Sequence, residues 1–146
     1  MNEKRKLKAN EVLNGTWGEV WVNGSYMANV IAFKAEATAK TTTVSMVQNL
    51  TDGQKLTGIE RKGEVKFHKV NSSITKMLIN ELKKGKMPTI TIISNLKDPD
   101  VSGNERVACY GCKFEKAIIA DWEAGKMLEE SYSFTYEDEA FLDTIS

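Results

Sequence analysis

The chain has 146 residues, of which 41% are hydrophobic and 27% charged, with 20 basic and 20 acidic side chains. These values fit one soluble globular domain, and no run approaches the ~18 consecutive apolar residues of a membrane-spanning helix. Zero net charge argues against a protein whose whole surface attracts nucleic acid.

The N-terminal residues 1–13 are polar and basic, and we expect an arm that is either disordered or ordered only by a neighbour. No apolar run follows the charged residues 3–8, so the sequence predicts no secretory signal. The remaining residues, 14–146, are expected to form a single domain.

A hairpin is expected to open this domain. Residues 16–22 have strand character, and Asn23-Gly24 follows at once. This dipeptide is a strong hairpin signal, because a type I′ turn needs positive φ at both positions. The returning strand is expected over 25–37. Since its two faces are both apolar near the middle, we expect it to be covered on both sides.

Residues 38–58 show no clear core role. Their Thr-rich first part has β propensity but little alternation of core and surface side chains, and Asn49, Asp52-Gly53 and Gly58 follow. About 20 residues without a core role are unusual in a compact domain. The segment is therefore expected to be an extended loop, either disordered or used for contact with another molecule.

The next strand is predicted over 63–70, with Val65 and Phe67 on one face and polar side chains on the other. The polar face carries His68, the only histidine of the chain. A half-exposed strand histidine is its ordinary role. No Gly-x-Ser-x-Gly elbow and no phosphate-binding glycine loop accompanies it, so the case for an enzyme is weak.

One helix is predicted over 72–85. Its apolar stripe has helical spacing, Asn71 and the two following serines offer N-caps, Gly85 is placed for a C-cap, and Pro88 prevents continuation. The stripe consists of Ile74, Met77, Leu78 and Leu82. A single amphipathic helix among strands most simply covers one end or face of a sheet.

Three further strands are predicted over 89–94, 106–119 and 127–136, the second bent at Gly111. In the last strand, alternate side chains face inward, and the outward set is Glu129, Ser131, Ser133 and Thr135. Residues 137–139 begin an acidic tail. The sequence therefore predicts a mainly β fold, a barrel or sandwich of six or seven mostly antiparallel strands with one flanking α-helix.

The two cysteines form one Cys-x-x-Cys pair, Cys109 and Cys112. A structural zinc site needs about four ligands, and the chain has no second pair. A redox pair usually begins a helix, whereas this segment has strand character, which places the two thiols on opposite faces. Two unpaired thiols are therefore favoured, and a redox pair or a metal site is the alternative.

Three blocks of sequence carry a family resemblance. They are Asn14-Gly-Thr-Trp-Gly-Glu-Val-Trp-Val-Asn-Gly, then Lys55-Leu-Thr-Gly-Ile-Glu-Arg-Lys-Gly-Glu-Val-Lys-Phe-His-Lys-Val, and finally Leu96-Lys-Asp-Pro-Asp-Val-Ser-Gly-Asn-Glu-Arg-Val-Ala with residues 120–130 and 141–143. With these blocks the chain resembles the tail tube proteins of contractile phage tails, particularly the PBSX-like prophage type. The basic arm departs from the family pattern, and the cysteine pair lies outside its motifs.

The resemblance implies a small β-barrel with a flanking helix, similar in fold to the tube proteins of type VI secretion systems. It implies hexameric rings that stack into a hollow tube inside a contractile sheath, assembled in the bacterial host cytoplasm as part of a virion tail or tail-like particle. Such a tube passes DNA or punctures a target envelope. The implied partners are further copies, the sheath, the baseplate and the tail terminator, with DNA as transient cargo. No catalytic residue, metal or cofactor is implied.

Two sets of residues receive a role from the resemblance. The expected assembly loop contains Thr42, Thr43, Val44, Met46, Val47, Gln48, Asn49 and Leu50. The expected lumen-facing set is Glu129, Ser131, Ser133 and Thr135, and Glu64, Lys66 and His68 meet the same description. A lumen-facing strand face is polar, but each set fits a face toward outside solvent equally well.

Three rival functions remain at this point. A type VI secretion tube shares the architecture. A nucleic-acid-binding β-barrel needs a basic groove interleaved with aromatics, but the basic clusters at 4–8, 61–69 and 83–86 lie apart from the tryptophans. A thiol or metal protein would use the cysteine pair.

The charge is unevenly distributed along the chain, since the first 70 residues hold 11 basic and 7 acidic side chains. We expect the basic arm and the acidic tail to help orient stacked rings.

Overall fold

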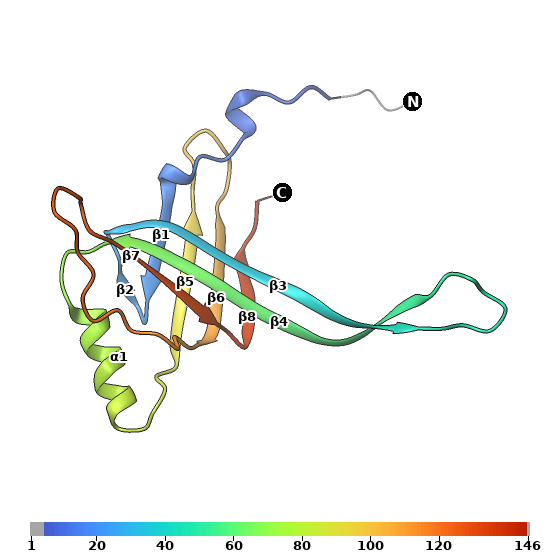
Figure 1. The fold of residues 1–146 in the computed structure, drawn as a ribbon. Coiled ribbons are helices and arrows are strands. Elements are labelled where there is room, and N and C mark those ends of the chain that lie inside the picture. Colours follow the sequence, from blue (N-terminus) through green and yellow to red (C-terminus); the bar gives the residue numbers. More distant parts are fainter. Residues whose placement is uncertain (1–4, 146) are drawn as a thin grey trace.

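A computed structural model describes residues 5–145 of the chain, which form two antiparallel sheets and one α-helix (Figure 1). The strands are β1 (Gly18–Val22), β2 (Ser25–Tyr26), β3 (Val30–Val44), β4 (Gly53–His68), β5 (Ile90–Leu96), β6 (Glu105–Cys112), β7 (Glu129–Thr135) and β8 (Asp138–Asp143). The helix α1 spans Ser73–Lys83, and short 3-10 turns span Ala9–Glu11 and Gly15–Trp17. Within residues 5–145 no helix has the length and apolarity to cross a membrane.

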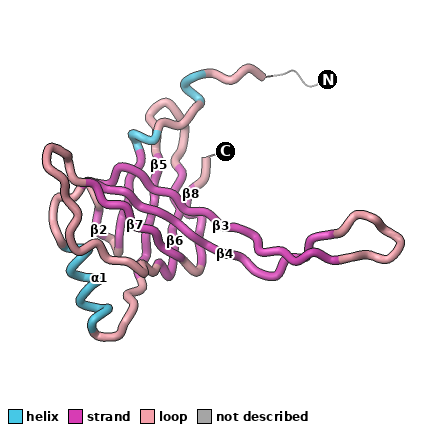
Figure 2. The backbone as a smooth tube through the Cα atoms, in the orientation of Figure 1, coloured by secondary structure: helices cyan, strands magenta, loops and turns pink. Residues whose placement is uncertain are grey.

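The two sheets differ in size and cross each other (Figure 2). The five-stranded sheet has the order β2-β1-β5-β6-β8, and the three-stranded sheet has the order β3-β4-β7. All named pairings are antiparallel. The predicted mainly β fold with one flanking helix is therefore confirmed, with eight strands where six or seven were expected.

The core lies between the sheets and follows from strand alternation. Val65 and Phe67 of β4 are buried, as are Tyr132 and Phe134 of β7, and the side chains between them are exposed or half-buried. Glu130 lies on the same inward face of β7 but is polar, and its buried carboxylate lies 3.0 Å from the Lys69 ammonium group. Phe67 stacks on Tyr132 and Phe33 stacks on Phe134, while Phe114 packs against both β7 rings. The predicted inward faces of β4 and β7 are confirmed.

Helix α1 closes one end of the space between the sheets (Figure 1). Leu78 is fully buried, and Ile74 and Met77 pack against the core cluster. The helix begins after Asn71, whose side-chain oxygen accepts a hydrogen bond from the backbone N–H of Ser73 at 3.1 Å. It ends before Gly85, which has a φ of +75°. The helix prediction is thus confirmed to within two residues at each end.

The returning strand of the first hairpin is not continuous. The turn Asn23-Gly24 has positive φ at both residues, as predicted, but the strand that follows breaks after Tyr26. Its two parts, β2 and β3, belong to different sheets. The expectation that it is covered on both sides is wrong, because Phe33 packs against the core whereas Tyr26 and Ile31 are 51% and 44% exposed.

The segment 38–58 is not a loop. Strand β3 continues to Val44 and β4 starts at Gly53, so these residues form a long β-hairpin that projects from the body (Figures 1 and 2). No alternation reveals these strands in the sequence, because both of their faces are solvent-exposed. The pairing of the two backbones still satisfies their hydrogen-bonding groups.

The end of β6 also differs from the prediction. The strand stops at Cys112 because Gly111 adopts a φ of +67°, and 114–119 form no strand. The same irregularity turns both cysteine side chains into the core, so the expected placement on opposite faces is wrong. The acidic tail likewise forms a strand, β8, which pairs with β6.

Candidate assembly surfaces

The most prominent surface is the hairpin arm, defined here as residues 38–58. The two strands stay in register from Thr38 opposite Glu60 to Val44 opposite Gly53, with one irregularity next to Lys40. At that point the Thr57 hydroxyl donates a hydrogen bond to the Lys40 carbonyl at 3.1 Å. The arm is therefore an ordered two-stranded ladder that extends beyond the core.

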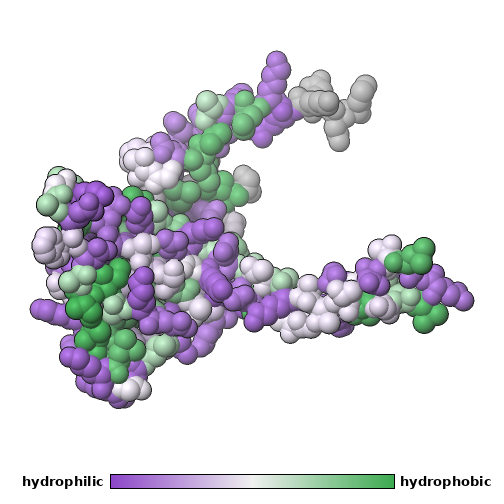
Figure 3. Space-filling view, viewed as in Figure 1, coloured by the Kyte–Doolittle hydropathy of each residue, from purple (hydrophilic) through white to green (hydrophobic). Residues whose placement is uncertain are grey.

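The tip of this arm, residues 44–53, is apolar and uncovered. Val47 and Leu50 are almost fully exposed, and green apolar atoms mark the tip in Figure 3. The eight residues predicted for assembly all lie here or just before the tip, and all are exposed. On β3 these are Thr42, Thr43 and Val44, and in the turn they are Met46, Val47, Gln48, Asn49 and Leu50. Several exposed apolar side chains gathered at the end of an arm are typical of a contact surface.

A second surface is the polar face of the three-stranded sheet. The predicted set Glu129, Ser131, Ser133 and Thr135 is solvent-facing, and so is the set Glu64, Lys66 and His68 on the neighbouring strand. One ion pair and one hydrogen bond hold charged side chains of this face in place. Lys66 lies 3.2 Å from Glu129, and the Ser131 hydroxyl donates to Glu64. The structure thus brings the two predicted sets together on one polar face, where they carry two carboxylates and one lysine.

The edges of this sheet are open. Strand β3 has β4 on one side only, and β7 has β4 on one side and a single bridge, between Thr135 and Lys113, on the other. Unpaired backbone groups at a sheet edge favour pairing with another strand. The backbone groups along these edges are therefore available to pair with strands of neighbouring molecules.

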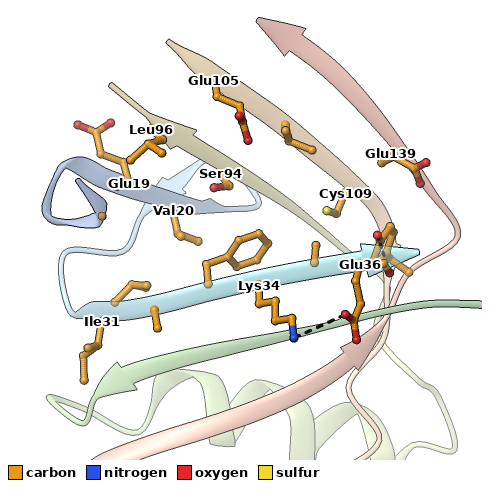
Figure 4. A pocket seen from close by; sticks show the side chains of 18 of the residues that line it. Glu19, Val20, Ile31, Lys34, Glu36, Ser94, Leu96, Glu105, Cys109 and Glu139 are labelled. Atoms are coloured by element: carbon orange, nitrogen blue, oxygen red, sulfur yellow. Dashed lines mark hydrogen bonds and ion pairs between the residues drawn. The ribbon is translucent and has the colours of Figure 1, made fainter. Parts of the chain in front are cut away.

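A third surface is a cleft of about 860 Å³ between the edge of β3 and the five-stranded sheet (Figure 4). Its floor contains Val20 and the buried Cys109. At one end the Arg61 guanidinium lies 2.6 Å from Glu139. We call it the acidic cleft, because four carboxylates line it against a single basic side chain, Lys34, which lies 3.6 Å from Glu36. The carboxylates are those of Glu19, Glu36, Glu105 and Glu139.

No pattern in the sequence predicts this cleft. The cleft exists because β3 and the five-stranded sheet diverge at their edges. This divergence follows from the angle at which the two sheets cross, and no local sequence pattern encodes that angle. The Arg61–Glu139 pair joins residues far apart in the chain, and it was missed for the same reason.

The two thiols do not form a reactive site. Burial raises the pKa of Cys109 to about 11 and that of Cys112 to about 12. Both side chains are fully buried, and the Cys112 thiol lies 3.4 Å from the Cys109 carbonyl oxygen. Since the thiolate is the nucleophile and the metal ligand, protonated thiols in the core fit a packing role.

Comparisons with known proteins agree with this arrangement. Residues 5–143 match the family described as "Phage tail tube protein". The chain is 32% identical over 134 residues to the phage-like element PBSX protein XkdM of Bacillus subtilis (strain 168), covering 90% of this chain and 91% of that one. The uncharacterized protein YqbM of the same organism matches to the same extent.

Solved structures share the fold. A chain of the PVC extracellular contractile injection system, in its extended sheath-tube complex, superposes with a TM-score of 0.70 at 6% identity, covering 97% of this chain and all of that one. A chain of the anti-feeding prophage baseplate gives 0.63 at 12% identity, covering 86% and 90%. The open edges of the three-stranded sheet and the exposed tip of the hairpin arm are compatible with assembly. The match over residues 5–143 shows that this chain belongs to the phage tail tube protein family.

Proposed function

We propose that this subunit assembles into hexameric rings that stack to form the inner tube of a contractile phage tail or tail-like particle. The observation that carries the proposal is the three-stranded sheet, which has one core face, one polar face and open edges. A closed ring of such sheets removes the open edges, because each edge strand pairs with that of the next copy.

The dimensions of such a ring fit a conduit. Six copies of three strands, at ~4.8 Å spacing and ~45° tilt, give a barrel with a backbone radius of about 20 Å. Allowing ~6 Å for side chains leaves a channel about 28 Å wide, which admits a DNA duplex of ~20 Å. In this ring the polar face with Glu129, Ser131, Ser133 and Thr135 lines the channel. Because this face carries no excess of positive charge, it does not retain a passing polyanion.

The hairpin arm connects one subunit to the next. The exposed tip residues Met46, Val47 and Leu50 become buried against a neighbouring subunit or ring, and the arm strands offer backbone pairing. The outer surface of the tube meets the tail sheath, and its ends meet the baseplate and the tail terminator. The role is structural, and transport of DNA or puncture of an envelope needs no catalytic group.

Electron microscopy of the concentrated protein tests the proposal. Negative-stain images are expected to show rings and hollow rods, and a reconstruction of the rods is expected to show six-fold symmetry with β7 facing the channel. A chain that remains monomeric at high concentration, or rods whose channel is lined by the five-stranded sheet, would contradict it.

A shortened arm tests the contribution of the hairpin. Replacing residues 45–52 by Asn-Gly keeps the two strands joined by a tight turn, so the core is expected to fold unchanged. This variant is expected to give a native circular dichroism spectrum and a native melting temperature but no rods. As a matched control, Val47→Thr and Leu50→Thr keep the arm length and remove only the apolar tip. Normal rods from the shortened variant would refute the role of the arm's tip.

A further inference from the structure

The acidic cleft has the composition of a binding site for a basic, apolar segment. The strand register places Glu105, Val107 and Cys109 of β6 in one row facing the cleft, next to Phe141 of β8. Phe141 is 68% exposed although it lies on the inward face of its sheet. Within residues 5–145, Glu105 has no basic side chain within salt-bridge distance. An exposed aromatic ring and an unpaired carboxylate thus line one hollow, and Figure 4 shows the carboxylate of Glu105 there.

The N-terminal arm, residues 5–13, has the complementary composition. Arg5, Lys6 and Lys8 surround Leu7, which is 75% exposed. Every residue of this arm is exposed except Glu11, which is half-buried beside Arg5. Basic and apolar side chains are therefore presented together without a surface of their own chain to cover them.

The base of this arm is fixed. The backbone N–H of Asn14 donates a hydrogen bond to the side chain of Asp98 at 2.9 Å, and Asp98 is itself buried. The same carboxylate accepts a hydrogen bond from the backbone N–H of Asp100. Held at this point, the arm leads away from the body (Figure 1). Its nine residues can reach up to ~30 Å when extended, which is enough to meet a neighbouring molecule.

We propose that the N-terminal arm of one copy of this chain docks in the acidic cleft of a second copy. Leu7 covers the exposed ring of Phe141, and the basic side chains lie against the carboxylate of Glu105, since Glu36 and Glu139 are already paired with Lys34 and Arg61. The proposal deepens the proposed function, because it names a contact that joins two copies. It also gives a use to the basic arm, which the body of its own subunit leaves uncovered.

Charge decides between the arm and another exposed apolar segment, the hairpin tip. Residues 44–53 contain a single charged side chain, the carboxylate of Asp52. An acidic segment is repelled by a cleft lined with carboxylates, whereas the basic arm is attracted and oriented by it. The arm is therefore the occupant that the electrostatics favour, and the tip is the competing outcome of the experiment.

Photo-crosslinking in the assembled protein tests the contact directly. Leu7 is replaced by benzoylphenylalanine, and the variant is mixed with ¹⁵N-labelled wild-type chain before illumination. Mass spectrometry is expected to find crosslinks from position 7 to Phe141 or Ile31 in which the two peptides come from differently labelled chains. Crosslinks within one chain only, or crosslinks to any other surface, would overturn the proposal.

Charge reversal with rescue gives a second test. The triple variant R5E/K6E/K8E is expected to raise the protein concentration needed for half-assembly by about tenfold, in line with several rim ion pairs of modest strength. Adding E105K to this variant is expected to recover most of the loss. A matched control, K83E/K84E/K86E, makes the same charge change at the end of α1 and is expected to assemble normally.

The outcomes separate this contact from the proposed function. If the wild-type chain forms no rings or rods, the proposed function itself fails. If rods form and R5E/K6E/K8E assembles as well as wild type, or E105K gives no rescue, the tube stands and the arm–cleft contact is refuted.

Discussion

Gly63 of β4 has no space for a side chain, and its substitution tests the packing of the two sheets. A Cβ atom at this position would lie 2.3 Å from Cζ of Phe134 and 2.8 Å from the carbonyl oxygen of Lys34. The ring cannot retreat, because Phe33 and Phe114 pack against it. Overpacking of this kind costs about 3 kcal/mol, and the lower chain entropy of Ala in the unfolded state offsets about 1 kcal/mol. Gly63→Ala is therefore expected to destabilise the fold by about 2 kcal/mol.

Urea unfolding of the monomeric protein measures this change in the free energy of unfolding. In thermal unfolding, the melting temperature is expected to fall by about 6 to 8 °C. Gly58→Ala on the same strand is the matched control, because its Cβ would meet only the Lys40 side chain at 3.8 Å. In the double variant G63A/F134L the smaller side chain gives the methyl group room. We expect the two changes to couple by at least ~1 kcal/mol. Wild-type stability of G63A, or strict additivity in the double variant, would refute the packing argument.

Three further predictions concern single contacts. Arg61→Ala removes the 2.6 Å ion pair with Glu139 that joins the sheets; the urea midpoint is expected to fall, and by less at 1 M salt, because salt screens the pair. Asp98→Ala leaves two backbone N–H groups without their acceptor and is expected to cost about 1 to 3 kcal/mol, with faster tryptic cleavage of the N-terminal arm. The thiols of Cys109 and Cys112 keep their protons in the fold up to about pH 11 and 12, whereas unfolded thiols lose them near pH 9. Above pH 9 the unfolded chain therefore binds fewer protons than the folded chain, so the free energy of unfolding of the wild type is expected to fall between pH 9 and 11. The fall is expected to be smaller in a double Cys→Ala variant. An equal fall in both proteins would contradict the view that the two buried thiols cause it.

The parts of the fold that the sequence predicted are those with one buried face. Strand β4 alternates between Val65 or Phe67 inside and His68 outside, and helix α1 places Leu78 on a continuous apolar stripe. Burial of one face imposes a period on the sequence, and the period reveals the element. The polar face of β7 was recognisable for the same reason, and its place on the channel side remains a proposal.

The parts that were missed lack such a period. The hairpin arm is exposed on both faces, so nothing in its Thr-rich sequence separates a strand from a loop. Strand β8 is an edge strand with Phe141 exposed, and its acidic start suggested a tail. The inward turn of Cys112 depends on the positive φ of Gly111, a backbone feature that shifts the alternation by one residue. Contacts between distant segments, such as the acidic cleft, leave no local pattern at all.

Strands β3 and β4 run through both the core and the hairpin arm. The direction of the arm is therefore set by the position of these two strands where they leave the core. From Thr38 to Val44 the ladder spans about 23 Å, and it bends most readily at the irregularity beside Lys40. A rotation of β4 by about 10° within the core would swing the tip by about 4 Å, close to the spacing of one strand. The packing of a few aromatic rings thus sets the aim of a distant surface. Substitutions deep inside the subunit are then able to misalign a tube while leaving every subunit folded.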